Sequence, residues 1–380
     1  MKAVIAIDSF KGSLDTLESG AAVADGIKAV YPEAEIVISP IADGGEGTVS
    51  AIVSATGGEL CHTEVTGPLG DRMIAEYGII HQSRTAVIEM SAAAGITLVP
   101  QEKRNPLYTT TRGVGELMLD AMERGCRHFI MGIGGSATND GGVGMLSALG
   151  FEFLDENGEN VAYGAVGLRA IRKIVLDNVD TRLAECDFRV ACDVKNPLCG
   201  EYGCCRVYGP QKGADEKMIS DMDSWLSDYA ELTKSVIPDA DKYFSGVGAA
   251  GGMGFALKYY LGASLTSGIK LVMETTGLEE RINNADVVVT GEGRIDGQTA
   301  MGKAPVGVAE LAKKYGKTVI AFAGAITEDS GECNKQGIDA FFPIVRTPCT
   351  LADAMNKENA YKNLKNTAEQ VFRLIKCSQK

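Results

Sequence analysis

Short apolar runs alternate with longer amphipathic segments along most of this chain. The apolar runs that end at glycine or a polar residue predict β-strands at Val4–Ile7, Glu35–Ser39, Val87–Met90, Phe129–Ile133, Phe188–Ala191, Val287–Val289, Val319–Ala323 and Ala340–Pro343. Helical patterns lie between several of them, at Thr16–Val30, Thr48–Ala55, Val114–Arg124 and Pro305–Tyr315. Because unalternated apolar strands are typical of sheets covered on both faces, the pattern predicts an α/β fold with a parallel sheet.

The ends of the chain are built alike, whereas the middle is less regular. Each end consists of strand, glycine-rich loop and helix units, while the middle contains long polar stretches such as 155–167 and 214–233. A chain of 380 residues also exceeds the usual size of one hydrophobic core. We therefore predict one α/β domain formed by residues 1–66 plus 281–380, and an inserted α/β domain formed by residues 67–280.

Composition and charge narrow the class of protein. The apolar share of 45% and the charged share of 23% are typical of globular proteins and exclude a disordered chain. A net charge of −13 argues against a nucleic-acid partner, which needs a basic surface. Since no apolar run is long enough for a membrane span or a signal peptide, we expect a cytoplasmic protein with no membrane contact.

Cysteine usage points to reduced thiols. The ten cysteines are spread over a long chain, and the cluster between Cys192 and Cys205 contains no C-x-x-C pair. Buried thiols are therefore favoured, and a zinc site is the weaker alternative.

Glycine is over-represented, with 46 of 380 residues, and the excess is concentrated in loops. Glycines stand beside hydroxyls or carboxylates just after predicted strands at 8–13 (DSFKGS), 132–142 (GIGGSATNDGG) and 290–296 (TGEGRID). Glycine lets backbone N–H groups approach an anion, and a following helix adds its positive end. The sequence therefore predicts that the protein holds a phosphate group.

Familiar nucleotide motifs do not account for these loops. The stretch 246–251 (GVGAAG) matches G-x-G-x-x-G, but the segment before it, IPDADKYFS, is not a buried strand. The stretch 316–318 (GKT) resembles the end of a P-loop, yet Leu311 occupies the position of its first glycine. An NAD-dependent oxidoreductase is therefore a weak alternative.

The loop at 132–144 combines backbone donors with polar side chains. Its candidate ligand-binding residues are Gly134, Gly135, Ser136, Thr138, Asn139 and Asp140. Two hydroxyls and a carboxylate beside glycines suit a phosphate, a metal ion or a proton transfer. The structural alternative is a tight turn with a helix cap.

The loop after the first strand offers a second group. Lys11 provides a positive charge for a phosphate or carboxylate, Ser9 provides a hydroxyl, and Asp8 lies where a strand-end carboxylate commonly works. Helix capping by Ser13 or Asp15 explains part of this pattern but not Lys11.

Two further acidic loops carry similar chemistry. In 42–48 (ADGGEGT), Asp43 and Glu46 could hold magnesium or substrate hydroxyls, with a capping box as the structural alternative. In 290–296, Arg294 can bind a carboxylate or phosphate bidentately, and a structural pair with Asp296 competes with this interpretation.

Asp193 follows the strand at Phe188–Ala191 and is a candidate general base. Lys195 and Lys212 are candidate charge clamps. The structural alternative is a surface turn set by Pro197 and Gly200.

Taken together, these motifs carry a resemblance to a known family. They are DSFKGS at 8–13, ADGGEGT at 42–48, GIGGSATNDGG at 132–142, CDVKNPLCG at 192–200, GPQKGA at 209–214, GAAGGMG at 248–254 and TGEGRID at 290–296. In this order, over nearly the whole chain, they resemble the bacterial type I glycerate kinase family. The resemblance implies ATP-dependent phosphorylation of D-glycerate, most often to 2-phosphoglycerate, by a flavodoxin-like domain of both chain ends plus an inserted domain. A 3-phosphoglycerate product and a non-catalytic sugar-acid or nucleotide sensor are kept as alternatives.

The implied kinase chemistry suggests a role for each candidate. Phosphoryl transfer depends mainly on positioning and on charge neutralisation by Mg²⁺ and fixed cations. We expect Gly134, Gly135, Ser136, Thr138, Asn139 and Asp140 to bind the ATP phosphates. We expect Lys11 and Arg294 to bind the glycerate carboxylate or the transferred phosphoryl group, and Asp193 to take the proton. Asp43 and Asp296 are alternative bases or magnesium ligands; the remaining substrate contacts are Asp8, Ser9, Glu46, Lys195 and Lys212. A homodimer is left open.

Overall fold

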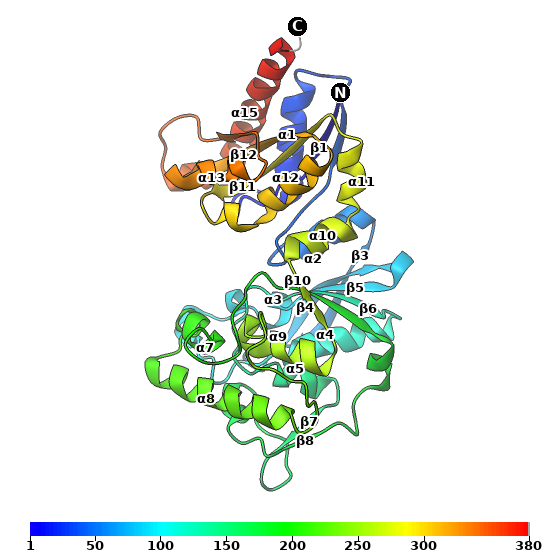
Figure 1. Ribbon diagram of the computed structural model, residues 1–380, viewed down its shortest axis with the longest axis vertical. Helices are drawn as coiled ribbons and strands as arrows, with labels where there is room; N and C mark the ends of the chain where they lie inside the picture. The colour runs from blue at the N-terminus through cyan, green and yellow to red at the C-terminus, as the bar shows by residue number, and fades with distance from the viewer. Residues whose placement is uncertain (379–380) are drawn as a thin grey trace. The chain divides into compact units, whose positions relative to one another are not determined.

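The computed structural model describes residues 1–378 of the chain, which fold into two compact units (Figure 1). Unit 1 contains residues 1–43, 50–56 and the described chain from Ile269 onward, and unit 2 contains residues 44–49 and 57–268. Both chain ends thus belong to unit 1. The division falls earlier than residues 66 and 281, where we expected it. The reason is that residues 59–66 pair into the sheet of unit 2, while Ile269 and Leu278 lie in a core of unit 1.

Unit 1 is built on a parallel sheet of five strands in the order β13-β12-β11-β1-β2. The strands are β1 (Lys2–Ile5), β2 (Glu35–Ile38), β11 (Val287–Ile295), β12 (Thr318–Ile326) and β13 (Ala340–Pro343). Counted within the unit alone, this is the 2-1-3-4-5 order of flavodoxin-like folds. The predicted flavodoxin-like domain of both chain ends is confirmed.

Helices cover both faces of this sheet. Neighbouring residues of β1 point to opposite faces, so that Ile5 packs in one core and Val4 in the other. The helices of unit 1 are α1 (Thr16–Lys28), α10 (Gly268–Thr275), α11 (Leu278–Asn283), α12 (Ala304–Lys314), α13 (Glu332–Lys335), α14 (Leu351–Met355) and α15 (Lys357–Ser378). α1 and α15 lie side by side (Figure 1), so close that a Cβ on Gly26 would come 2.4 Å from the Lys365 carbonyl oxygen.

Unit 2 contains a mixed sheet in the order β10-β9-β6-β5-β4-β3. Its strands are β3 (Glu59–Thr66), β4 (Arg72–Ile80), β5 (Thr85–Glu89), β6 (His128–Gly132), β9 (Asp187–Ala191) and β10 (Ser264–Thr266). β5, β6 and β9 run parallel, as predicted, and β10, which was not predicted, continues this parallel part, whereas β3 and β4 are antiparallel to their neighbours. The difference arises because a short turn joins β3 to β4, and such a turn permits only antiparallel pairing.

The remaining elements of unit 2 enclose one large apolar core. They are α3 (Ser91–Ala94), α4 (Arg112–Glu123), α5 (Val143–Ala148), α6 (Ala165–Leu168), α7 (Cys204–Tyr208), α8 (Glu216–Thr233), α9 (Ala249–Tyr260) and the small hairpin β7 (Glu152–Leu154) and β8 (Lys173–Val175). The helix α2 (Thr48–Thr56) contains residues of both units: its first two residues belong to unit 2, and residues 50–56 belong to unit 1.

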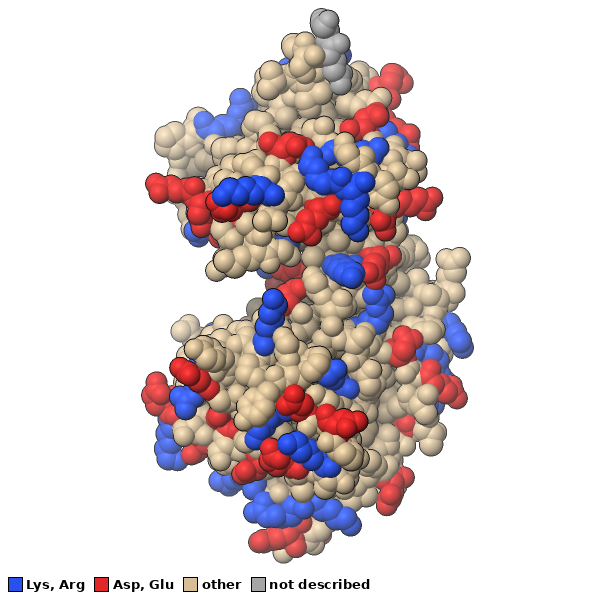
Figure 2. All heavy atoms as spheres, in the orientation of Figure 1, with Lys and Arg blue, Asp and Glu red and all other residues tan. Residues whose placement is uncertain are grey.

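The surface of each unit is of mixed charge. On the face shown in Figure 2, lysine and arginine side chains alternate with acidic side chains over both units, without a continuous basic stripe. Among the helices of residues 1–378, none combines the length and the apolar character that crossing a membrane requires.

Candidate active site

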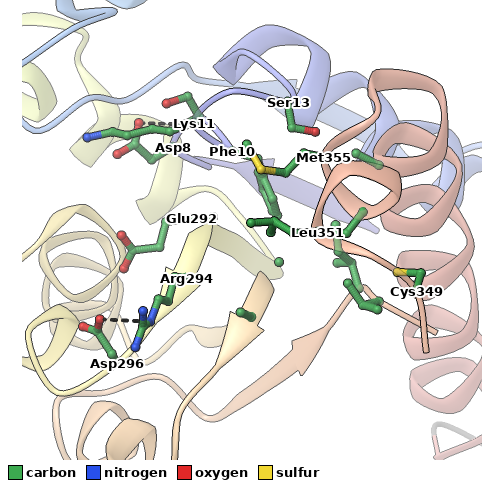
Figure 3. Close-up of a pocket in the computed structure, with 18 of the residues that line it drawn as sticks. Asp8, Phe10, Lys11, Ser13, Glu292, Arg294, Asp296, Cys349, Leu351 and Met355 are labelled. Carbon is green, nitrogen blue, oxygen red and sulfur yellow. Dashed lines mark hydrogen bonds and ion pairs between the residues drawn. The ribbon is translucent and has the colours of Figure 1, made fainter. Parts of the chain in front are cut away.

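A cavity of about 800 Å³ lies in unit 1, at the carboxyl ends of β1 and β11 (Figure 3). These adjacent strands form the point where the strand order of the sheet reverses, which is where open α/β sheets bind ligands. The charged residues that line the cavity are Asp8, Lys11, Asp43, Glu292, Arg294, Asp296 and Lys303. The structure thus brings together predicted residues from the two ends of the chain.

Asp8 is the most perturbed acid of this cavity. It is 7% exposed, its backbone N–H is bonded to the Gly291 carbonyl of β11, and its Oδ1 accepts a hydrogen bond from the backbone N–H of Ser9 at 2.7 Å. Burial raises the pKa of Asp8 to about 7, and the nearby Asp43 carboxylate adds to this effect; the Ser9 N–H and Lys11 act against it. A carboxyl group with such a pKa can accept a proton near neutral pH.

The end of β11 supplies Glu292 and Arg294. Because side chains two residues apart on a strand share a face, both reach the cavity. Burial raises the pKa of Glu292, whose carboxylate accepts a hydrogen bond from the Thr299 hydroxyl at 2.6 Å. Arg294 has a side chain that is 64% exposed, and its Nε lies 3.5 Å from Asp296 Oδ2. An exposed pair of this kind is weak, so Arg294 can turn to a ligand.

Sequence reasoning did not select Glu292 or Lys303 as site residues. Glu292 belongs to the TGEGRID motif, and Lys303 follows it. The signal for Glu292 is its place two residues before Arg294 on the same strand, which puts both side chains on one face.

The glycine-rich loop at 132–144 lies in unit 2, and most of it is packed inside. Gly134 and Gly135 are exposed, whereas the other four candidates are buried: Ser136, Thr138, Asn139 and Asp140. The ATP phosphates were expected to contact all six. Gly134 and Gly135 are the exposed members of this set, and contact of all six with the ATP phosphates stays a prediction.

The carboxylate of Asp140 is hydrogen-bonded to groups of the protein itself. Its carboxylate accepts hydrogen bonds from the backbone N–H and hydroxyl of Thr111 at 2.8 and 2.9 Å, and from the N–H groups of Gly142 and Gly144 at 3.1 and 3.3 Å. These donors lie at the starts of α4 and α5. Burial raises the pKa of Asp140, and the four donors oppose that rise. Asp140 therefore joins two helix starts, which agrees with the capping alternative.

Lys212 is likewise a core residue of unit 2. It is 2% exposed, and its Nζ donates a hydrogen bond to the Thr138 carbonyl at 2.6 Å. Burial lowers the pKa of Lys212 to about 8. Nearby, Asn139 Nδ2 donates to Cys205 Sγ at 3.3 Å. These contacts hold the loop in place, and the buried thiols expected from the sequence are part of them.

The GVGAAG stretch packs against the same loop. A Cβ on Gly251 would come 2.1 Å from the Thr138 carbonyl oxygen, and the Gly141 N–H bonds to the Gly251 carbonyl at 3.0 Å. The glycines of this stretch therefore permit close backbone packing, which explains the match to a dinucleotide motif without a dinucleotide.

The remaining candidates are exposed residues of unit 2 outside the cavity of unit 1. They are Glu46, Asp193 and Lys195. Asp193 Oδ1 accepts a hydrogen bond from the Gly268 N–H at 3.1 Å. Glu89, which we did not select, ends β5 and accepts a hydrogen bond from the Val49 N–H at 2.8 Å, and burial raises its pKa. It anchors residues 44–49 to this sheet.

A buried carboxyl of raised pKa beside cations and further carboxylates, at the switch point of a flavodoxin-like sheet, is an arrangement that suits a phosphotransferase acting on a small anionic alcohol. The glycerate kinase family model matches residues 3–376, and the chain therefore belongs to the glycerate kinase family. It is accordingly a kinase that uses ATP and phosphorylates glycerate. This membership sets aside the oxidoreductase and the non-catalytic sensor.

Individual relatives agree with this family. The chain is 50% identical over 364 residues to glycerate 2-kinase of Escherichia coli K12, covering 96% of this chain and 95% of the relative. It is 46% identical over 379 residues to glycerate kinase of Bacillus subtilis 168, covering 100% and 99%. A crystal structure described as glycerate kinase 2 of Salmonella typhimurium LT2 is similar with a TM-score of 0.91 and 47% identity, covering 100% of this chain and 99% of that chain.

Proposed function

We propose that this kinase transfers the γ-phosphoryl group of ATP to the 2-hydroxyl of D-glycerate, and that the cavity of unit 1 holds the reacting groups. The observation that carries the proposal is Asp8, a buried carboxyl with a pKa of about 7 in the same cavity as Lys11 and Arg294. The name of the Escherichia coli relative, glycerate 2-kinase, supports the choice of product over 3-phosphoglycerate.

The proposed reaction needs a proton acceptor and a set of cations. The glycerate oxygen forms a bond to the γ-phosphorus, the bond to the bridging oxygen breaks, and ADP leaves. Asp8 takes the hydroxyl proton, while Lys11 and Arg294 neutralise the phosphoryl oxygens. Lys303 lines the same cavity and adds a third cation. Asp193 stays the alternative proton acceptor.

Magnesium fits the carboxylates of this cavity. Mg²⁺ is usually held by one or two carboxylates together with substrate phosphates and water. Asp43 and Asp296 are the proposed ligands, and the rise that Asp43 causes in the Asp8 pKa is the repulsion that a cation would relieve. Among residues 1–378, no group of three or more His, Cys, Asp or Glu is arranged to hold a metal, so phosphate oxygens would complete the coordination. When bound, the ion would neutralise the phosphate charge.

The proposal is tested by identifying the product. Purified protein is incubated with Mg²⁺, ATP and either D- or L-glycerate, and the products are assigned by phosphorus NMR. We expect 2-phosphoglycerate from the D-enantiomer. Formation of 3-phosphoglycerate would overturn the product assignment, and the absence of any phosphoglycerate would overturn the proposal as a whole.

A cytoplasmic location and a homodimer remain predictions from the sequence. Light scattering coupled to size-exclusion chromatography tests the second, with a mass near 40.1 kDa indicating a monomer.

A further inference from the structure

The cavity of unit 1 has an apolar half that the proposed phosphoryl transfer does not use. This half is lined by Phe10, Ile344, Val345, Cys349, Leu351 and Met355. In Figure 3, Phe10 lies between the two halves, with Glu292 and Arg294 on one side and Leu351 and Cys349 on the other. The two halves are thus parts of one continuous space.

Several of the apolar side chains are unusually exposed for their type. Leu351 is 75% exposed and Met355 38% exposed, and both belong to the short helix α14. Met355 lies over the loop after β1, because a Cβ on Gly12 would come 2.7 Å from its Cε. Large apolar side chains gathered at a cavity and left open to water are typical of a ligand-binding wall.

The size of the cavity also exceeds what the acid substrate needs. Its volume of about 800 Å³ is in the range that holds a drug-sized ligand. Glycerate is a three-carbon acid with no apolar surface to match α14. ATP, by contrast, has a flat base at one end and a triphosphate at the other.

We infer that the apolar half of this cavity binds the nucleoside of ATP, an assignment that rests on the proposed function. The base lies against Phe10, Leu351 and Met355, and the triphosphate extends toward Lys11, Arg294 and Lys303. This orientation places the base against apolar side chains and the anionic triphosphate beside the cations. The competing assignment puts the nucleotide on the loop at 134–140 of unit 2, where the side chains of Thr138, Asn139 and Asp140 are buried.

The apolar half recognises the base mainly through shape. Two residues in this part of the lining carry a hydroxyl: that of Thr350 is bonded to Asp353 Oδ2 at 2.6 Å, and that of Ser13 has no partner among the described residues, so apolar side chains make up most of the surface offered to the base. The base is therefore held by contact with apolar surfaces, and removing such a surface weakens nucleoside binding without affecting the triphosphate.

The first test uses the exposed thiol of Cys349 as a probe. The whole chain is treated with N-ethylmaleimide, and labelling of each cysteine is followed by peptide mass spectrometry. We expect Mg·ATP to slow labelling of Cys349 by about tenfold or more, since a bound nucleoside covers it. Cys377 is also exposed and lies outside the cavity lining, so its labelling is the internal control.

The second test removes the apolar wall. The double variant Leu351→Ser/Met355→Ser is expected to raise the Kd of a fluorescent ATP analogue by about tenfold, while competition by inorganic tripolyphosphate is unchanged. Leu374→Ser is the matched control, because Leu374 is 65% exposed but lies on α15 outside the cavity lining.

The outcomes separate this inference from the proposed function. If the wild-type protein makes phosphoglycerate but Mg·ATP leaves Cys349 labelling unchanged and the double variant binds the analogue normally, the inference is wrong. Protection of Cys349 by D-glycerate alone would also overturn it. If Mg·ATP protects Cys349 but no phosphoglycerate forms, the nucleoside site stands and the proposed function fails.

Discussion

Asp8 in unit 1 and Asp140 in unit 2 have similar sequence contexts but different environments. Each follows a buried strand within a glycine-containing loop that leads to a helix, and burial raises the pKa of each. Asp140 accepts four hydrogen bonds from protein donors. Asp8 accepts a hydrogen bond from the Ser9 N–H and lines a cavity beside cations.

The difference shows what a strand-end carboxylate can do. A carboxylate whose lone pairs are already used by protein donors can fix the local structure but has little capacity left for a ligand. A buried carboxylate that faces a cavity keeps that capacity, and its raised pKa suits it for proton transfer. We therefore expect substitution of Asp8 to affect catalysis and substitution of Asp140 to affect folding.

The largest expected effect is on turnover. Asp8→Asn should lower kcat by about a thousandfold, because the amide cannot accept the hydroxyl proton. The measurement is the initial rate of ADP formation with saturating ATP and D-glycerate. Asp193→Asn is assayed alongside; a larger loss for Asp193→Asn than for Asp8→Asn would move the proton acceptor to unit 2.

Asp140→Ala should act on stability instead. It leaves the N–H groups of Thr111, Gly142 and Gly144 without their acceptor, at a cost of about 3 kcal/mol in the free energy of unfolding. Urea unfolding followed by circular dichroism measures this cost. A variant with native stability but a strongly raised KM for ATP would show that Asp140 contacts the nucleotide after all.

The pH dependence of stability tests the raised pKa of Asp8 directly. Since the pKa of Asp8 is about 7 in the folded protein and 3.8 in the unfolded reference, the folded state holds a proton that the unfolded state releases between these values. Asp8 therefore lowers stability as pH rises from about 4 to about 7, by roughly 4 kcal/mol. Asp8→Asn removes this decline, so it should be more stable than wild type at about pH 8. An unchanged pH profile of unfolding in this variant would contradict the raised pKa.

The smallest expected effect concerns Arg294. Arg294→Lys keeps the charge but loses the bidentate geometry, so KM for one of the substrates should rise by about tenfold. Arg373→Lys, on the exposed face of α15, is the control. Equal KM values for the two variants would show that Arg294 pairs with Asp296 but does not bind a substrate.

The five strands of the sheet in unit 1 and β5, β6 and β9 of unit 2 could be predicted from their apolar runs, whereas β3, β4 and β10 could not. β3 and β4 alternate exposed and buried residues, for example exposed His62 and buried Cys61, so they lack the continuous apolar run that identified β1 or β11. β2 was expected to be covered on both faces but lies at the sheet edge with its residues partly exposed. The amphipathic helix α15 was not predicted either.

The sequence predicted those site residues that adjacent parallel strands bring together. Asp8, Lys11, Arg294 and Asp296 come together because each follows or ends one of two adjacent parallel strands. The environments of Asp140 and Lys212 could not be foreseen, because their partners Thr111 and Thr138 are distant in the sequence. Only tertiary packing decides whether such a polar side chain faces a ligand or a core.

The packing of α15 against α1 has a consequence for the newly made chain. During synthesis, Asp8 and Lys11 leave the ribosome long before β11, and unit 1 acquires both helices of that face only when α15 has been made. Unit 2 is contiguous apart from residues 44–49 and ends at Gly268. Its whole sequence has therefore been made before synthesis reaches β11 and α15. A chain that ends before α15 would therefore contain every residue of unit 2 but would lack one of the two helices that pack on this face of β1.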